Sequence, residues 1–197
     1  MDWIIKNFVN YIPHIFALLF FIVFLSIRNY YKTMPKTINY VSRKLTDSDL
    51  KMIKNKLQYM DDREFEIFIS YLFNKMGYYS EVTPQTNDKG KDVIVYDYCG
   101  DNSKTYVECK RYSENLSVSR EVIDKLIGAA TMDNVQHTIV ITTGRYTKQA
   151  LECRQRCPWL ELWYLGDLMN IIRQIDDTDI MRHLGFNREQ WGVRIEY

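Results

Sequence analysis

The sequence predicts an α/β domain with a mixed sheet flanked by helices, preceded by one transmembrane helix. After Thr46, helical and strand patterns follow in the order α-α-β-β-β-α-β-α-β-α, and such interleaving needs a sheet that helices cover on both faces. Hydrophobic residues make up 46% of the 197 residues, which is enough for a sizeable core. Before Thr46, an almost wholly apolar segment runs from Phe8 to Ile27.

The segment Phe8–Ile27 is expected to span a lipid bilayer. Only Asn10, Pro13 and His14 interrupt it, and about 20 helical residues cross a hydrocarbon core of ~30 Å. A signal peptide is the first alternative, but Leu25–Asn29 is a poor cleavage site. A buried core helix is the second, although such helices are seldom apolar on every side.

The charges beside this segment predict its orientation. Residues 1–44 hold six basic side chains against one acid, and five of the six follow the apolar segment. Because an excess of Lys and Arg stays on the cytoplasmic side, we expect a single-pass membrane protein whose domain faces the cytoplasm. The expected organisation is a membrane anchor with its flanks at 1–31, a basic linker at 32–45, the folded domain at 46–175 and a C-terminal extension at 176–197.

Charge and cysteine content narrow the classes of function. Beyond residue 44 the chain holds 20 basic and 24 acidic residues, so binding of nucleic acid would need a local basic strip. Cys153 and Cys157 are spaced to share a helical face, yet two thiols do not complete a tetrahedral zinc site. Cys99 and Cys109 add no C-x-x-C pair, so reduced, partly buried thiols are favoured over structural zinc.

Two helices are expected at the start of the domain. Thr46, Asp47 and Ser48 are cap candidates for the first, and Asp61 or Asp62 caps the second, which Gly77 ends. Glu66 lies at the edge of the second helix's apolar stripe, from which it could face the sheet. The stripes comprise Leu50, Ile53 and Leu57 in the first helix, and Phe65, Phe68, Ile69, Leu72, Phe73 and Met76 in the second.

Residues 88–112 predict a β-hairpin. β-Branched and aromatic residues fill the arms Val93–Tyr96 and Thr105–Val107, and a cluster of Gly, Asp, Asn and Ser forms the turn between them. Alternating strands and helices surround this hairpin. They are a strand at Tyr79–Thr83, a helix at Leu116–Asn134, a strand at His137–Thr142, a helix capped by Thr147, a strand at Leu160–Leu165 and a helix from Gly166.

Charged residues at one end of the hairpin indicate a metal-assisted site. Asp92 precedes the first arm, and Glu108 and Lys110 end the second, on one face, with Cys109 on the other. Two carboxylates can hold a hard divalent ion such as Mg²⁺, which acidifies a bound water and offsets charge on a phosphate. Taken alone, the spacing also fits an exposed Glu108–Lys110 ion pair without a chemical role.

Four motifs occur together between residues 60 and 170. They are Phe65-Glu66 in a helix ending at Met76-Gly77-Tyr78, D-x-G-x-D within Asp88–Ile94, C-K-R-Y within Val107–Tyr112, and T-T-x-x-Y-T-x-x-A from Thr142 to Ala150. With these motifs the chain resembles the Mrr-like restriction endonucleases of the PD-(D/E)XK nuclease superfamily. The core order of that family, α-β-β-β-α-β, agrees with the order expected above.

The resemblance implies hydrolysis of DNA phosphodiester bonds by a water activated by Mg²⁺ (or Mn²⁺). It assigns Asp92, Glu108 and the main-chain carbonyl of Cys109 to the metal, Lys110 to the catalytic lysine, and Glu66 to the acid contributed by a helix. Many Mrr-like members have Gln where this chain has Glu108. Glutamate is the more general choice in the superfamily, so this difference favours an active site.

DNA is the partner that the resemblance implies. Arg111, Arg120 and Arg145 are candidates for the local basic strip, contacting phosphates without reading the base sequence. Asp88 is expected to shape the turn together with Gly90 rather than to bind the metal.

The expected function is therefore a membrane-anchored, Mg²⁺-dependent DNA endonuclease, with restriction of foreign DNA implied by the resemblance alone. The alternative from another class is a catalytically inactive nucleic-acid-binding or scaffold module at the membrane. A third hypothesis is that the anchor recruits a partner that regulates the domain. Since cutting both strands commonly needs two active sites, a homodimer is a candidate assembly.

Overall fold

The computed structural model describes residues 44–85, 90–100 and 103–187. The chain divides into two units, Met1–Val41 and Ser42–Tyr197, and the second contains the α/β domain. The predicted membrane segment Phe8–Ile27 and most of the predicted linker lie outside the described residues. Of the helices in the described part of the chain, none combines the length and the apolar character needed to cross a membrane.

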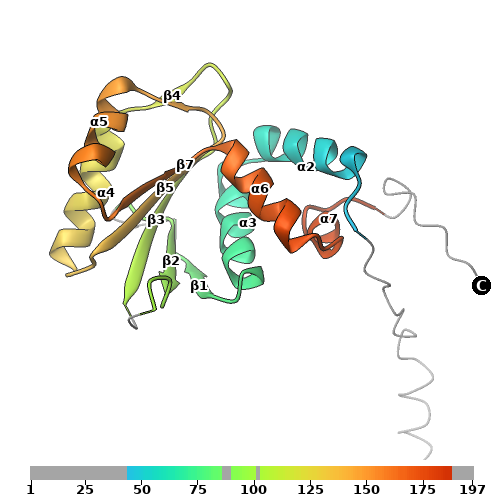
Figure 1. The fold of residues 1–197 in the computed structure, drawn as a ribbon, viewed down its shortest axis with the longest axis horizontal. Coiled ribbons are helices and arrows are strands. Elements are labelled where there is room, and N and C mark those ends of the chain that lie inside the picture. Colours follow the sequence, from blue (N-terminus) through green and yellow to red (C-terminus); the bar gives the residue numbers. More distant parts are fainter. Residues whose placement is uncertain (1–43, 86–89, 101–102, 188–197) are drawn as a thin grey trace, which may run out of the picture. The chain divides into compact units, whose positions relative to one another are not determined.

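A mixed sheet forms the centre of the domain (Figure 1). The strands of the described residues are β1 (Tyr79–Val82), β2 (Val93–Tyr96), β3 (Lys104–Lys110), β4 (Ser117–Val118), β5 (His137–Thr142), β6 (Arg145–Tyr146) and β7 (Leu160–Trp163). Five of them form one sheet in the order β1-β2-β3-β5-β7, in which β1, β2 and β3 are antiparallel and β3, β5 and β7 are parallel. The two short strands β4 and β6 pair in parallel beside it.

Helices lie on both sides of the sheet, as the order of elements predicted (Figure 1). They are α2 (Asp47–Tyr59), α3 (Asp62–Lys75), α6 (Leu165–Ile175) and α7 (Asp179–His183) on one side, and α4 (Arg120–Met132) and α5 (Lys148–Arg156) on the other. The predicted caps are confirmed, because the side chains of Thr46, Asp61 and Thr147 accept hydrogen bonds from the first turns of α2, α3 and α5.

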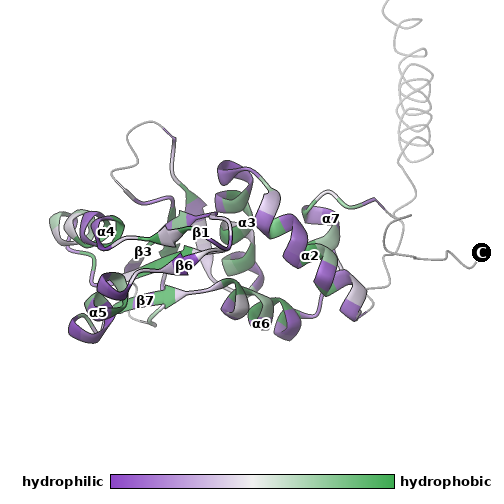
Figure 2. Ribbon diagram, turned by 90° about the horizontal axis from the view of Figure 1, so that it is seen from above, coloured by the Kyte–Doolittle hydropathy of each residue, from purple (hydrophilic) through white to green (hydrophobic). Residues whose placement is uncertain are grey.

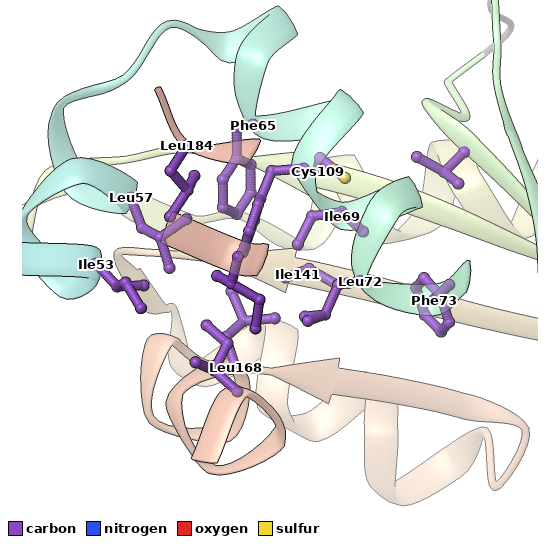
Figure 3. Packing of buried hydrophobic residues seen from close by; sticks show 14 of the residues in the cluster. Ile53, Leu57, Phe65, Ile69, Leu72, Phe73, Cys109, Ile141, Leu168 and Leu184 are labelled. Carbon is purple, nitrogen blue, oxygen red and sulfur yellow. The ribbon is translucent and has the colours of Figure 1, made fainter. Parts of the chain in front are cut away.

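The larger core lies between the sheet and α2, α3, α6 and α7 (Figure 3). Because strand side chains alternate, Val93, Val107 and Cys109 point into this layer. The residues labelled in Figure 3 are Ile53 and Leu57 of α2, Phe65, Ile69, Leu72 and Phe73 of α3, Leu168 of α6, Leu184, and Cys109 and Ile141 of the sheet.

The second core lies on the opposite face, under α4 and α5. Tyr106 and Val140 of the sheet pack there against Ile123 and Leu126 of α4. Figure 2 shows apolar residues gathered along the strands and the helix sides that face them. The side chains of Glu108 and Lys110, two and four residues after Tyr106 on β3, share this second face, so α4 lies on the same side as the candidate site.

Several elements differ from the sequence predictions. The helix expected from Leu116 begins at Arg120, since Ser117 and Val118 instead pair with β6. Val118 fits a helical stripe and a strand equally well, and the choice depends on a partner far along the chain. The strand expected to end at Leu165 ends at Trp163, because α6 begins at Leu165. In the predicted extension, α7 forms, and its Ile180 is fully buried.

Candidate active site

The pairing of β2 with β3 fixes Asp92 at the end of the hairpin. Its main-chain N–H donates to the Val107 carbonyl over 2.8 Å, and its Oδ2 accepts from the Cys109 N–H over 2.7 Å. The Asp92 side chain therefore bends back onto β3, and only 7% of the residue is exposed. The hairpin predicted from the sequence is thus confirmed, and it brings the first acid to the second arm.

Glu108 and Lys110 lie on the same face of β3, as their alternation predicted. Lys110 Nζ is 2.6 Å from Glu108 Oε1. Glu108 is only 4% exposed, and its Oε2 is buried without a hydrogen-bond partner in the part of the chain that the structure describes. The ion pair named in the alternative therefore forms, but Glu108 is buried and Lys110 is only partly exposed.

Asp92, Glu108 and Lys110 together carry more negative than positive charge. Burial raises the pKa of Glu108 above its ordinary value, and the charge of Asp92 raises it further, against the opposing influence of Lys110 and Lys125. For Lys110, burial lowers the pKa, but the charges of Glu108 and Asp92 and the hydrogen bond to Glu108 together outweigh burial, so the pKa is raised. Lys110 therefore remains an ammonium, while the two carboxylates repel each other.

Glu66 enters the neighbourhood from α3. Its Oε2 accepts from Arg63 Nη1 over 2.7 Å, and the same guanidinium nitrogen donates to the Thr83 carbonyl over 2.8 Å. Burial raises the pKa of Glu66, and the charge of Asp92 contributes in the same direction. The helical acid thus lies close enough to Asp92 to be affected by it, although its carboxylate is engaged by Arg63.

The donor set suits a hard divalent ion. In the described residues, no three or more His, Cys, Asp or Glu side chains lie together in a way that could hold a metal. Two carboxylates are nevertheless enough for Mg²⁺, which usually binds one or two and keeps several waters. The buried Glu108 Oε2, which accepts from no donor in the described part of the chain, fits such an ion. The roles of Asp92 and of the Cys109 carbonyl as ligands stay predictions.

The cysteines take no part in this donor set through their thiols. The Cys109 side chain lies in the larger core, where burial raises its pKa well above the ordinary value. Cys153 is buried in α5, and Cys157 caps the end of that helix. Two of the four are buried, one is half-buried and Cys99 is exposed, which agrees with the expected partly buried thiols.

The three arginines proposed to contact DNA lie on different elements, after β3, in α4 and in β6. Arg111 donates to Asp62 over 2.9 Å, and Arg120 donates to Asp124 over 3.1 Å. Arg145 is exposed on β6. Asp88, expected to shape the turn, lies outside the described residues.

Sequence reasoning missed Lys125 of α4. A Cβ atom on Gly90 would lie 2.9–3.0 Å from the side-chain carbons of Lys125, so the lysine crosses directly over the turn that precedes Asp92. Its charge also acts on Glu108. The signal was Gly90 itself, because a glycine in a D-x-G-x-D turn can mark the close approach of another chain segment.

Lys91 was missed as well, and it secures the same turn. Its Nζ is 2.6 Å from Asp133 at the end of α4 and 3.9 Å from the centre of the Tyr106 ring. Tyr106 completes the group by donating to the same Asp133 carboxylate over 2.6 Å. The residue beside Asp92 is therefore tied to α4.

A mixed α/β sheet whose inner strands carry two buried carboxylates and a lysine at one end defines the class of restriction-endonuclease-like nucleases. Residues 57–172 match the Mrr catalytic domain family, described as restriction endonuclease. Because this match covers more than half of the chain, the chain belongs to that family. It carries an Mrr-type restriction endonuclease domain. No curated protein matches the sequence.

Solved structures are similar in fold. The DNA modification-dependent restriction endonuclease AspBHI is 16% identical with a TM-score of 0.54, over 73% of this chain and 40% of that one. MspJI restriction endonuclease in complex with a 27-mer oligonucleotide is 15% identical with a TM-score of 0.47, over 79% and 39%. The protein of unknown function AF1548 is 10% identical with a TM-score of 0.45, over 69% and 73%. This chain thus spans about 40% of the AspBHI chain.

Proposed function

We propose that this protein is a membrane-anchored, Mg²⁺-dependent DNA endonuclease. The observation that carries the proposal is the buried Glu108 carboxylate, which has one oxygen on Lys110 and the other without a donor among the described residues. Leaving a buried charged oxygen unsatisfied is costly, so such a group is retained where a bound ion completes it. Membership of the restriction endonuclease family supports DNA as the substrate.

Each residue of the site has a role in this chemistry. Asp92 and Glu108 would hold Mg²⁺ (or Mn²⁺) together with the Cys109 carbonyl, and the ion would supply an acidified water and offset charge on the phosphate. Lys110, kept protonated by Glu108, can donate to the attacking water or to a non-bridging phosphate oxygen. Glu66 would complete the acidic group from α3.

Plasmid cleavage tests this proposal. We expect the full chain, purified in detergent, to nick plasmid DNA in Mg²⁺ and not in EDTA. Asp92→Ala and Lys110→Ala should each lower the rate by about 10²-fold or more, since each removes a group that acts on the reacting phosphate. Equal nicking rates for the unmodified chain and the two variants would instead favour the catalytically inactive nucleic-acid-binding module.

Membrane attachment is the second part of the proposal, and the apolar segment Phe8–Ile27 supports it. We expect the protein to sediment with membranes, to resist extraction by high salt and to be released by detergent. The basic residues after the segment support a cytoplasmic domain. Protease added outside intact cells should therefore leave the domain whole, and digestion of the domain would contradict the orientation.

A further inference from the structure

A cleft of about 450 Å³ opens at the edge of the sheet that carries the candidate active site. Its floor is Thr143 and Gly144, directly after β5, and its walls come from α2 and α6. The main-chain N–H of Thr143 donates to the Lys110 carbonyl over 3.3 Å, so the floor adjoins the end of β3. The carboxyl ends of parallel strands are where α/β sheets commonly bind ligands.

Three cations from separate elements line this cleft: Lys54 of α2, Arg145 of β6 and Arg173 of α6. All three are exposed, and no ion pair joins any of them to another residue within the described chain. The cleft has one acid, Glu114, whose Oε1 accepts from Gln58 over 2.8 Å. The lining is therefore positive overall, in a domain whose sequence is slightly acidic.

The first turn of α6 also lines this cleft, and its acid, Asp167, accepts from the Tyr164 N–H and is not among the lining residues. Leu165 and Gly166 begin the helix and both line the cleft. The N–H groups of a first turn have no partner within the helix, and the helix dipole makes this end attractive to anions. Apart from its chain neighbours and the backbone of α6, no atom of the described residues lies within 4 Å of the position that a Cβ would take on Gly166, so this part of the turn is open.

Backbone hydrogen bonds hold Arg145 in place beside the cleft floor. The Arg145 N–H donates to the Leu116 carbonyl over 2.9 Å, and β6 pairs with β4. Arg173 in turn donates from Nη1 to Asn170 Oδ1 over 3.1 Å. The cations thus project from a framework of strands and a helix, as a site that binds a fixed phosphate requires.

We propose that this cleft binds a backbone phosphate of DNA beside the phosphate that is cut, with Lys54 and Arg173 as contacts that the sequence did not indicate. The inference rests on the proposed nuclease function and names where its substrate lies. Contacts to phosphate fix the position of a duplex without reading its sequence. A concentrated positive site also allows a domain with a net negative charge to bind a polyanion.

Charge removal tests the cleft. In the full chain with Asp92→Asn, we would measure binding of a labelled duplex in Mg²⁺ at several salt concentrations. Lys54→Gln/Arg173→Gln should weaken binding about tenfold and reduce the slope of log K against log salt by roughly one to two, at ~0.9 per phosphate contact. The control variant Lys104→Gln/Arg156→Gln also removes one lysine and one arginine, but near the other end of the strands. It should bind the duplex as tightly as the Asp92→Asn parent does.

A second pair of variants separates binding from folding. Gly166→Asp places a carboxylate in the open cleft but at a helix start, where acids are favourable, so thermal stability should be kept or raised while DNA binding falls. Gly166→Ala should retain both the thermal stability and the DNA affinity of the parent. Equal DNA binding by these two variants would overturn the inference.

The outcomes distinguish this inference from the function on which it rests. Metal-dependent nicking together with unchanged binding by Lys54→Gln/Arg173→Gln would overturn the cleft alone, as would an equal loss in Lys104→Gln/Arg156→Gln. Absence of DNA binding by the Asp92→Asn parent would contradict the cleft and the DNA substrate together.

Discussion

At the scale of the residue, the site concentrates negative charge where little water reaches it. Asp92 and Glu108 are both nearly buried, and Lys110 neutralises only part of their charge. The N–H of Cys109 fixes the Asp92 carboxylate without cancelling it. Such a pair favours the binding of a divalent cation, because the ion relieves a repulsion that folding has already imposed.

Magnesium binding should therefore depend on pH. The pKa of Glu108 in the fold lies above its ordinary value of 4.5, so ionisation of this carboxyl lowers the free energy of unfolding. The loss is absent below pH 4.5 and complete above the pKa of the folded state. Mg²⁺ binds the ionised form, so its stabilising effect should grow as pH rises. At pH 8 and a Mg²⁺ concentration of 100 times its Kd, we expect the free energy of unfolding to rise by about 2.7 kcal/mol and Tm to rise by roughly 5–10 °C.

Thermal melts with and without Mg²⁺ at pH 5 and pH 8 check this expectation. Glu108→Gln serves as the control, since it keeps the side-chain shape but loses the titrating charge. It should melt at the same temperature with and without the ion. An equal Mg²⁺ effect in Glu108→Gln would show that the ion binds elsewhere.

At the scale of the element, the turn between β5 and β6 joins the site to the cleft. A Cβ on Gly144 would lie 2.6 Å from the Leu116 carbonyl and 2.8 Å from the Tyr112 Cβ. The loop after β3 can therefore lie against this turn only because residue 144 has no side chain. Thr142 supports the same contact, as its Oγ1 donates to the Lys110 carbonyl over 2.7 Å.

Gly144→Ala should consequently destabilise the domain by about 1–3 kcal/mol, because backbone atoms have to move apart to admit the methyl group. Gly128→Ala is the matched control. No atom lies within 4 Å of a Cβ at Gly128, inside α4, so this substitution should stabilise by roughly 0.5–1 kcal/mol. Urea unfolding of the two variants measures the difference. Equal stabilities would show that the loop adapts.

At the scale of the whole molecule, local sequence patterns predicted the mixed sheet, its covering helices and the end of the hairpin that carries the acids. Val93–Tyr96 and His137–Thr142 form strands with the predicted bounds, because their composition and flanking turns suffice. Ser117–Val118 could not be predicted as a strand, since β4 exists only through its pairing with Arg145–Tyr146.

The same limit applies to the site. Glu108 and Lys110 were predictable together because they are two residues apart on one strand, where alternation brings them to one face. The approach of Lys125 to Gly90 depends on how α4 crosses the sheet, which no local pattern contains. Likewise, Lys54, Arg145 and Arg173 are far apart in sequence, and only the fold gathers them around one cleft.

The rate of plasmid nicking by Glu108→Gln tests the central claim, that the buried carboxylates form a nuclease site, most directly. Glu121→Gln is the control, because Glu121 is exposed in the first turn of α4 and has no role in the proposed chemistry. In Mg²⁺ we predict that Glu108→Gln lowers the rate by about 10²-fold or more, while Glu121→Gln matches the unmodified chain. Equal rates for all three proteins would contradict the account.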